Sequence, residues 1–138
     1  MLNEHKPKQI DIYPRRSLPL LMPVDKKLKP IRLSTTLYKE FAEAMERGEK
    51  TEEYRQATPY WQKIFEPLAG TKRPIEIHFI VGPWWWDFEV LQIEFRKDLV
   101  FENEDTRKRE HWGPYYILSI GKMLGKGDSR KDREKKRR

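Results

Sequence analysis

The strongest constraint on the fold is a stretch in which apolar and polar residues alternate, the pattern of a strand with one buried face. It runs from Ile75 to Val81 and ends at the chain-breaking pair Gly82-Pro83. The stretches 88–95 and 115–120 predict two further strands, and a change of parity near Val90-Leu91 indicates a bulge. The second half of the chain therefore predicts a sheet.

The first half of the chain adds a strand and two helices. We expect a strand at 30–34, followed by a helix that Thr35 or Thr36 caps and that Gly48 ends. Thr58-Pro59 marks the start of a second, short helix, because proline is well suited to the first helical position. The predicted fold class is α+β: a small β-barrel of about five to six mostly antiparallel strands with two flanking helices.

The net charge of +7 is unevenly distributed along the chain. Residues 1–32 and residues 125–138 each carry eight basic and three acidic residues, whereas residues 33–124 carry 13 basic and 16 acidic residues. We expect a proline-rich basic arm at 1–29, a domain at 30–124 and a basic, disordered tail at 125–138. The arm and the tail attract phosphate without reading sequence, or serve only to keep the chain in solution.

The absence of cysteine excludes disulfides, a cysteine nucleophile and thiolate metal sites. No apolar run approaches the roughly 20 residues that a membrane-spanning helix needs, and the first residues lack the apolar core of a signal peptide. The three histidines are scattered and no pair has the spacing of metal ligands. We expect a cytoplasmic protein with no membrane partner, no metal and no cofactor.

The most informative segment lies between the two helices, at residues 48–55. If residues 51–55 form a strand, Glu53 and Arg55 point to one face, and Lys50 approaches from the turn before it. A carboxylate that only accepts hydrogen bonds and a guanidinium that only donates them suit the edge of a planar heterocycle. The alternative is an ordinary ladder of surface salt bridges.

Aromatic residues elsewhere offer stacking surfaces for such a heterocycle. Tyr60, Trp61 or Trp112 would supply the wall against which it stacks. The run Trp84, Trp85 and Trp86 follows Gly82-Pro83, and we expect a loop there with at least one exposed indole. That loop is a stacking platform or a patch for a protein partner; the alternative is that two indoles cover the end of the barrel and one packs on the arm.

The segment resembles the G-x-K-x-x-E-x-R signature of ASCH domains, with Gly48, Lys50, Glu53 and Arg55 at the matching positions. Two further features match: the E-Y-R triplet at residues 53–55 and the Pro-Tyr-Trp helix start at residues 59–61. A third is the aromatic closing strand, which includes residues 115–117 and is followed by Gly121. The resemblance covers roughly residues 30–124. It implies a PUA-like barrel that binds RNA or a modified nucleotide in a cleft beside the first helix.

A polar loop is predicted from Glu102 to Glu110, and the resemblance extends to the residues 110–114 that follow it, before the last strand. Family members carry a W-G-containing loop there, which implies that Glu110, His111 or Trp112 lies near the cleft. The alternative is that each of them is an ordinary loop residue without contact to a ligand.

Binding ranks above catalysis in this interpretation. Some family members resemble amidohydrolases that act on N4-acetylcytidine, and others resemble ribonucleases. The amidohydrolase pattern has threonine where this chain has Glu53. In an enzyme, Lys50 and Glu53 are the candidate catalytic residues, and the neighbouring carboxylates would hold the lysine in its charged form. The ligand-binding set is Lys50, Glu53, Arg55, Trp61, Glu110 and Trp112. The third alternative is a protein-interaction module that uses the tryptophan run.

Overall fold

The computed structural model describes the backbone of residues 8–9, 18–19, 24–98, 100–102, 106–111 and 113–137. Only the backbone is described at residues 8–9, 18–19, 100–102, 110–111 and 134–137. Most of the N-terminal arm and Trp112 lie outside these residues, as do the side chains of Glu110 and His111. The elements are, in chain order, β1 (Lys8–Gln9), β2 (Leu18–Pro19), β3 (Ile31–Thr36), α1 (Lys39–Glu46), β4 (Glu52–Gln56), α2 (Pro59–Phe65), the 3-10 helix η2 (Glu66–Leu68), β5 (Ile75–Val81), β6 (Trp84–Arg96), β7 (Val100–Glu102), β8 (Arg109–His111), β9 (Tyr115–Asp128) and α3 (Ser129–Arg137).

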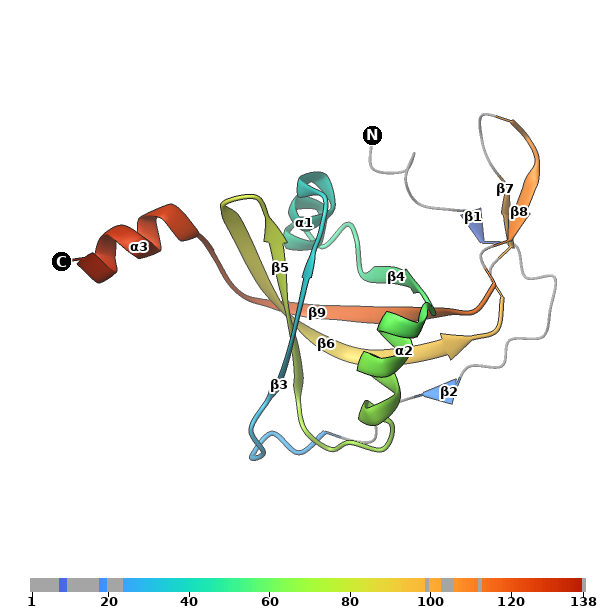
Figure 1. Cartoon of the computed structure of the whole chain (residues 1–138), viewed down its shortest axis with the longest axis horizontal. Helices are drawn as coiled ribbons and strands as arrows, with labels where there is room; N and C mark the ends of the chain where they lie inside the picture. The colour runs from blue at the N-terminus through green and yellow to red at the C-terminus, as the bar shows by residue number, and fades with distance from the viewer. Residues whose placement is uncertain are drawn as a thin grey trace. The chain divides into compact units, whose positions relative to one another are not determined.

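A mixed sheet forms the centre of the fold, with the strand order β3-β5-β6-β9-β4 and β2 paired to β6. β3 runs parallel to β5, and β5 turns at Gly82-Pro83 into the antiparallel β6 (Figure 1). A second, three-stranded sheet has the order β1-β7-β8. The predicted α+β class, a small barrel-like fold with a few short helices, is confirmed.

The alternation that predicted β5 is present in its burial. Ile75, Ile77 and Phe79 are buried and pair with the buried residues Val90, Phe88 and Trp86 of β6, respectively. The buried positions of β6 then change parity between Val90 and Ile93, at the point where the sequence indicated a bulge.

The first helix begins later than predicted. Thr35 and Thr36 do not cap it, because both lie in β3, where they pair with Phe79 and Ile80 of β5. The N-cap position of α1 belongs to Tyr38, whose side chain makes no capping hydrogen bond. Pairing along the parallel strand thus takes precedence over the local capping signal.

The predicted end of α1 and the predicted start of α2 are both confirmed. Gly48 has a φ of 77°, the left-handed conformation that favours glycine, and its N–H donates to the carbonyl of Met45. α2 starts at Pro59, and the hydroxyl of Thr58 accepts a hydrogen bond from the backbone N–H of Trp61 at 3.4 Å.

Three stretches contain more regular structure than predicted. Trp84, Trp85 and Trp86 do not form a loop: they are the first residues of β6. The paired strands β7 and β8 extend into the two ends of the polar loop predicted at 102–110. β9 continues past Gly121 to Asp128 and is followed by α3, in the segment predicted to be a disordered tail.

The chain divides into two compact units, each built from several segments. Unit 1 contains Glu52–Thr71 and Gln92–Leu118 together with β1 and β2, and unit 2 contains Val24–Thr51, Lys72–Leu91 and Ser119–Arg138. The long strands β6 and β9 contribute residues to both units.

Candidate functional site

Glu53 and Arg55 form an ion pair in unit 1. They are two residues apart on β4, so their side chains share one face of the strand, as predicted. The Arg55 Nη2 donates to the Glu53 Oε2 at 2.7 Å, the short distance typical of a hydrogen bond between charged groups.

Glu53 is buried, with a relative exposure of only 6%, and it is the one charged residue in the buried class within the described part of the chain. Removing a carboxylate from water is costly unless the charge is paired and hydrogen-bonded. The Arg55 side chain, which is 20% exposed, supplies that pairing. The alternative of an ordinary surface salt bridge is therefore wrong for this pair.

A series of aromatic rings lies next to the pair. The Arg55 guanidinium is 5.4 Å from the centre of the Trp61 ring, within range of a cation–π contact. Trp61 stacks on Phe65 with ring centres 5.1 Å apart and an angle of 13° between planes. Phe65 meets the edge of the buried Tyr116 at 4.7 Å. α2 thereby holds a half-buried indole beside the guanidinium.

The other face of β4 is built around Tyr54. Its ring stacks on Tyr115 at 5.9 Å, and its hydroxyl donates to Glu52 at 3.2 Å. Burial, followed by the negative charge of Glu52, raises the pKa of Tyr54 well above its usual value. Tyr54 therefore stays protonated and acts as a hydrogen-bond donor that supports the strand.

The structure brings Glu53, Arg55 and Trp61 together, but the four residues of the predicted motif are divided between the units. Gly48 and Lys50 belong to unit 2. There the Lys50 ammonium is 4.9 Å from the centre of the Phe41 ring. The predictions for the Glu110 side chain and for Trp112 fall outside the described residues.

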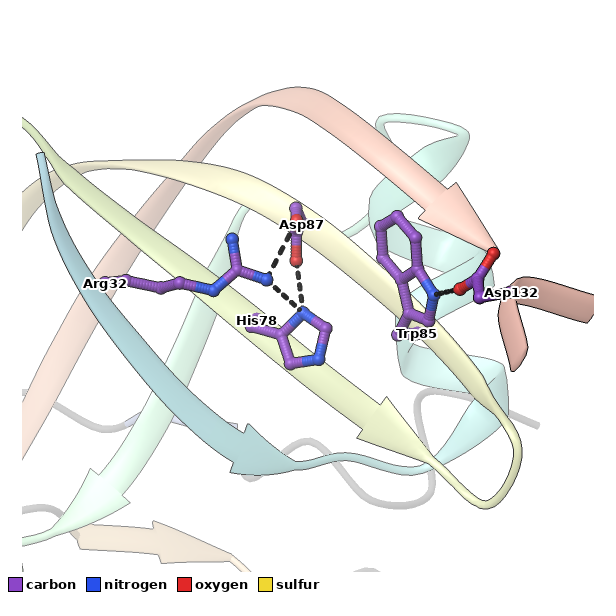
Figure 2. A network of polar contacts seen from close by, with 5 residues as sticks. All are labelled: Arg32, His78, Trp85, Asp87 and Asp132. Carbon is purple, nitrogen blue, oxygen red and sulfur yellow. Dashed lines mark hydrogen bonds and ion pairs between the residues drawn. The ribbon is translucent and has the colours of Figure 1, made fainter. Parts of the chain in front are cut away.

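Sequence reasoning missed a polar network in unit 2, shown in Figure 2. His78 Nδ1 is 2.6 Å from Asp87 Oδ1, and Arg32 Nη2 is 2.9 Å from His78 Nδ1 and 3.3 Å from Asp87 Oδ2. The three residues come from β5, β6 and β3. Only the histidine carried a signal in the sequence, as a polar position in an alternating strand.

The shortest of these distances assigns the proton of the imidazole. An ionised carboxylate only accepts hydrogen bonds, so Nδ1 of His78 carries the hydrogen and donates it to Asp87. The Arg32 guanidinium forms an ion pair with the second oxygen of Asp87 at 3.3 Å, and its Nη2 also lies 2.9 Å from Nδ1 of the ring. In Figure 2 the other ring nitrogen, Nε2, lies on the side of the imidazole away from Asp87, and in the tautomer with the hydrogen on Nδ1 this nitrogen is the acceptor.

The three consecutive tryptophans occupy three different environments, all within unit 2. Trp84 is exposed, and Lys39 lies 4.6 Å from its ring centre. Trp86 is buried and donates to Glu46 at 2.8 Å, and this bond, with a second from Lys126, lowers the pKa of Glu46. Alternation along β6 sends Trp85 to the opposite face, where its indole N–H donates to Asp132 of α3 at 3.0 Å.

Among the described residues, no group of three or more histidine, aspartate or glutamate side chains is arranged to hold a metal ion. None of the helices in the described part of the chain has the length and apolar content needed to cross a membrane. Comparison of the chain with protein-family models, with curated proteins and with solved structures gives no match.

Proposed function

We propose that the protein binds a nucleobase-containing ligand, a modified nucleotide or a nucleotide of RNA, through Glu53, Arg55 and Trp61. The observation that carries the proposal is the buried carboxylate of Glu53, bonded to a guanidinium that contacts an indole. Burial of a charged group lowers stability. We therefore infer that the Glu53 carboxylate on β4 has a role in ligand binding. The resemblance to ASCH domains supports the same residues.

Each side chain has a role that follows from its chemistry. Trp61 is half-buried and stacks on Phe65, and a base stacks on the part of the indole that remains exposed. Arg55 donates hydrogen bonds to a carbonyl oxygen or to phosphate, and Glu53 accepts from an exocyclic amine. The pair therefore distinguishes bases by the donors and acceptors along their edges.

We propose binding rather than catalysis because of the position of Lys50. A lysine that acts as a general base or nucleophile has to be neutral, whereas the face of an aromatic ring attracts a cation. The ammonium of Lys50 lies over such a face, that of Phe41. This placement favours the charged form of the side chain, which suits a binding role.

The experiment is an equilibrium binding screen of canonical nucleosides, their monophosphates and N4-acetylcytidine against the full-length protein. Arg55→Gln removes the guanidinium and its charge and keeps a shorter side chain that still forms hydrogen bonds. We expect it to weaken binding of the best ligand by at least about tenfold, since a hydrogen bond to a charged group contributes about 1.5–3 kcal/mol. Glu53→Gln, which turns an acceptor into a mixed donor and acceptor, should change the order of preference among bases.

Arg47→Gln is the matched control. Arg47 and Glu49 are also an arginine and a glutamate two residues apart, with 2.9 Å between their charged atoms, but their side chains are 51% and 58% exposed. We expect this variant to bind as the wild type does. Equal loss in both arginine variants would indicate a general effect of charge, and no binding of any member of the screen would contradict the proposal.

A further inference from the structure

Trp85 lies flat on strand β9 because that strand carries glycine beneath it. A Cβ atom added at Gly127 would lie 2.7 Å from Cζ2 of the indole, and one added at Gly125 would lie 3.5 Å from its Cζ3. Both glycines lie on the face of β9 that packs against Trp85. The indole is half-buried, so one side rests on bare backbone and part of its surface reaches solvent.

Polar groups surround this indole on the same face of the sheet. His78 lies beside it, with ring centres 5.6 Å apart, and the Asp87 carboxylate fixes the imidazole. Arg32 adds a guanidinium whose side chain is 54% exposed. Figure 2 shows Arg32, His78 and Asp87 pointing toward one another next to Trp85. The face therefore combines an aromatic surface, a cation and an acceptor nitrogen.

The helix that holds Trp85 in place is strongly basic. α3 contains six basic and two acidic residues, and Asp132, one of the two acidic residues, accepts the hydrogen bond from the indole. The backbone N–H of Ser129 bonds to the carbonyl of Pro83 at 2.7 Å, which fixes the start of the helix next to the tryptophan run. A basic helix therefore starts next to the tryptophan run, where the Arg130 guanidinium lies 5.9 Å from the centre of the Trp84 ring.

We infer that this face of unit 2 binds a base and its neighbouring phosphates from a single-stranded nucleic acid. The base stacks on Trp85, His78 Nε2 accepts from its edge, and Arg32 with the basic residues in the first turns of α3 attracts the phosphates. Stacking on an aromatic ring beside basic groups is the general way in which proteins hold single strands. An acidic protein segment would use the same cations but would have no need of the indole. The inference shares its class of ligand with the proposed function and rests on different residues.

The test follows the indole N–H signals of the five tryptophans in the full-length protein by two-dimensional ¹H–¹⁵N NMR. Single tryptophan-to-phenylalanine variants assign the signals. We expect a ten-nucleotide oligo-uridylate or oligo-thymidylate to shift the Trp85 signal. Trp85→Leu should weaken oligonucleotide binding by about tenfold, and Trp85→Phe, which keeps a ring, should restore part of it. Arg32→Gln, at an exposed side chain, should weaken binding by about threefold without disturbing the fold.

Trp84→Leu is the control, because it removes the neighbouring indole from the other face of β6; we expect less than a twofold change. The inference is overturned if the oligonucleotide binds without moving the Trp85 signal, if Trp85→Leu binds as tightly as Trp84→Leu, or if no oligonucleotide binds. The proposed function has its own readouts in the Trp61 signal and in the nucleoside screen, so either idea can fail while the other stands.

Discussion

Units 1 and 2 both place a carboxylate and an arginine near a tryptophan, but they assemble the group in different ways. In unit 1 the carboxylate and the guanidinium belong to one strand, two residues apart, and the carboxylate is buried. In unit 2 they come from two strands with a histidine between them on a third, and the Arg32 guanidinium is largely exposed. The same chemistry thus has different consequences for stability in the two units.

The two carboxylates differ in how far they depend on the neighbouring arginine for charge compensation. Glu53 has left water, so its charge depends on Arg55 for compensation. Asp87 has two partners, His78 and Arg32, and loss of the exposed one leaves the other in place. We therefore expect the Glu53–Arg55 pair of unit 1 to combine binding with a structural role, whereas Arg32 of unit 2 can be changed with little effect on folding.

The largest expected effect is that of Arg55→Met on stability. Loss of the guanidinium leaves the buried Glu53 carboxylate with a weaker set of hydrogen bonds, and we expect the free energy of unfolding to fall by about 1–3 kcal/mol. Arg32→Met, at an exposed ion pair, should change it by less than about 0.5 kcal/mol. Urea denaturation of the two variants measures both. Equal effects would remove the contrast between the units.

A smaller effect, of about 1–2 kcal/mol, is expected for Gly127→Ala, because overpacking a filled site forces its neighbours to move. The added Cβ would lie 2.7 Å from the Trp85 ring, and the indole N–H signal of Trp85 should shift. Gly125→Ala is the matched change on the same strand, where the corresponding distance of 3.5 Å is an ordinary contact. If the two alanine variants were equally stable, Trp85 would not be held against β9 in the way described.

Local signals in the sequence predicted much of unit 1. Alternation along β4 placed Glu53 and Arg55 on one face, and Thr58-Pro59 located the start of the helix that carries Trp61. These features depend on residues within a few positions of one another, where backbone geometry alone decides which side chains meet. The burial of Glu53 was not predictable, because it depends on what packs over the strand.

The network of unit 2 had no comparable signal. Arg32 and His78 meet because β3 pairs in parallel with β5, in a register that sets Ser34 opposite His78 across more than 40 residues of chain. Gly121 was interpreted as the end of a strand, yet β9 continues and its glycines make room for the side chains of Leu91 and Trp85. A glycine in a strand indicates a break only when nothing lies against it.

The central claim is that Glu53, Arg55 and Trp61 hold a nucleobase, and a crystal structure of the protein with the tightest ligand of the nucleoside screen tests it most directly. The account predicts the plane of the base against the Trp61 indole, with a polar atom of the base or phosphate within about 3.2 Å of Arg55 or Glu53. A ligand bound elsewhere, with Trp61 and the Glu53–Arg55 pair left without contact to it, would contradict the account.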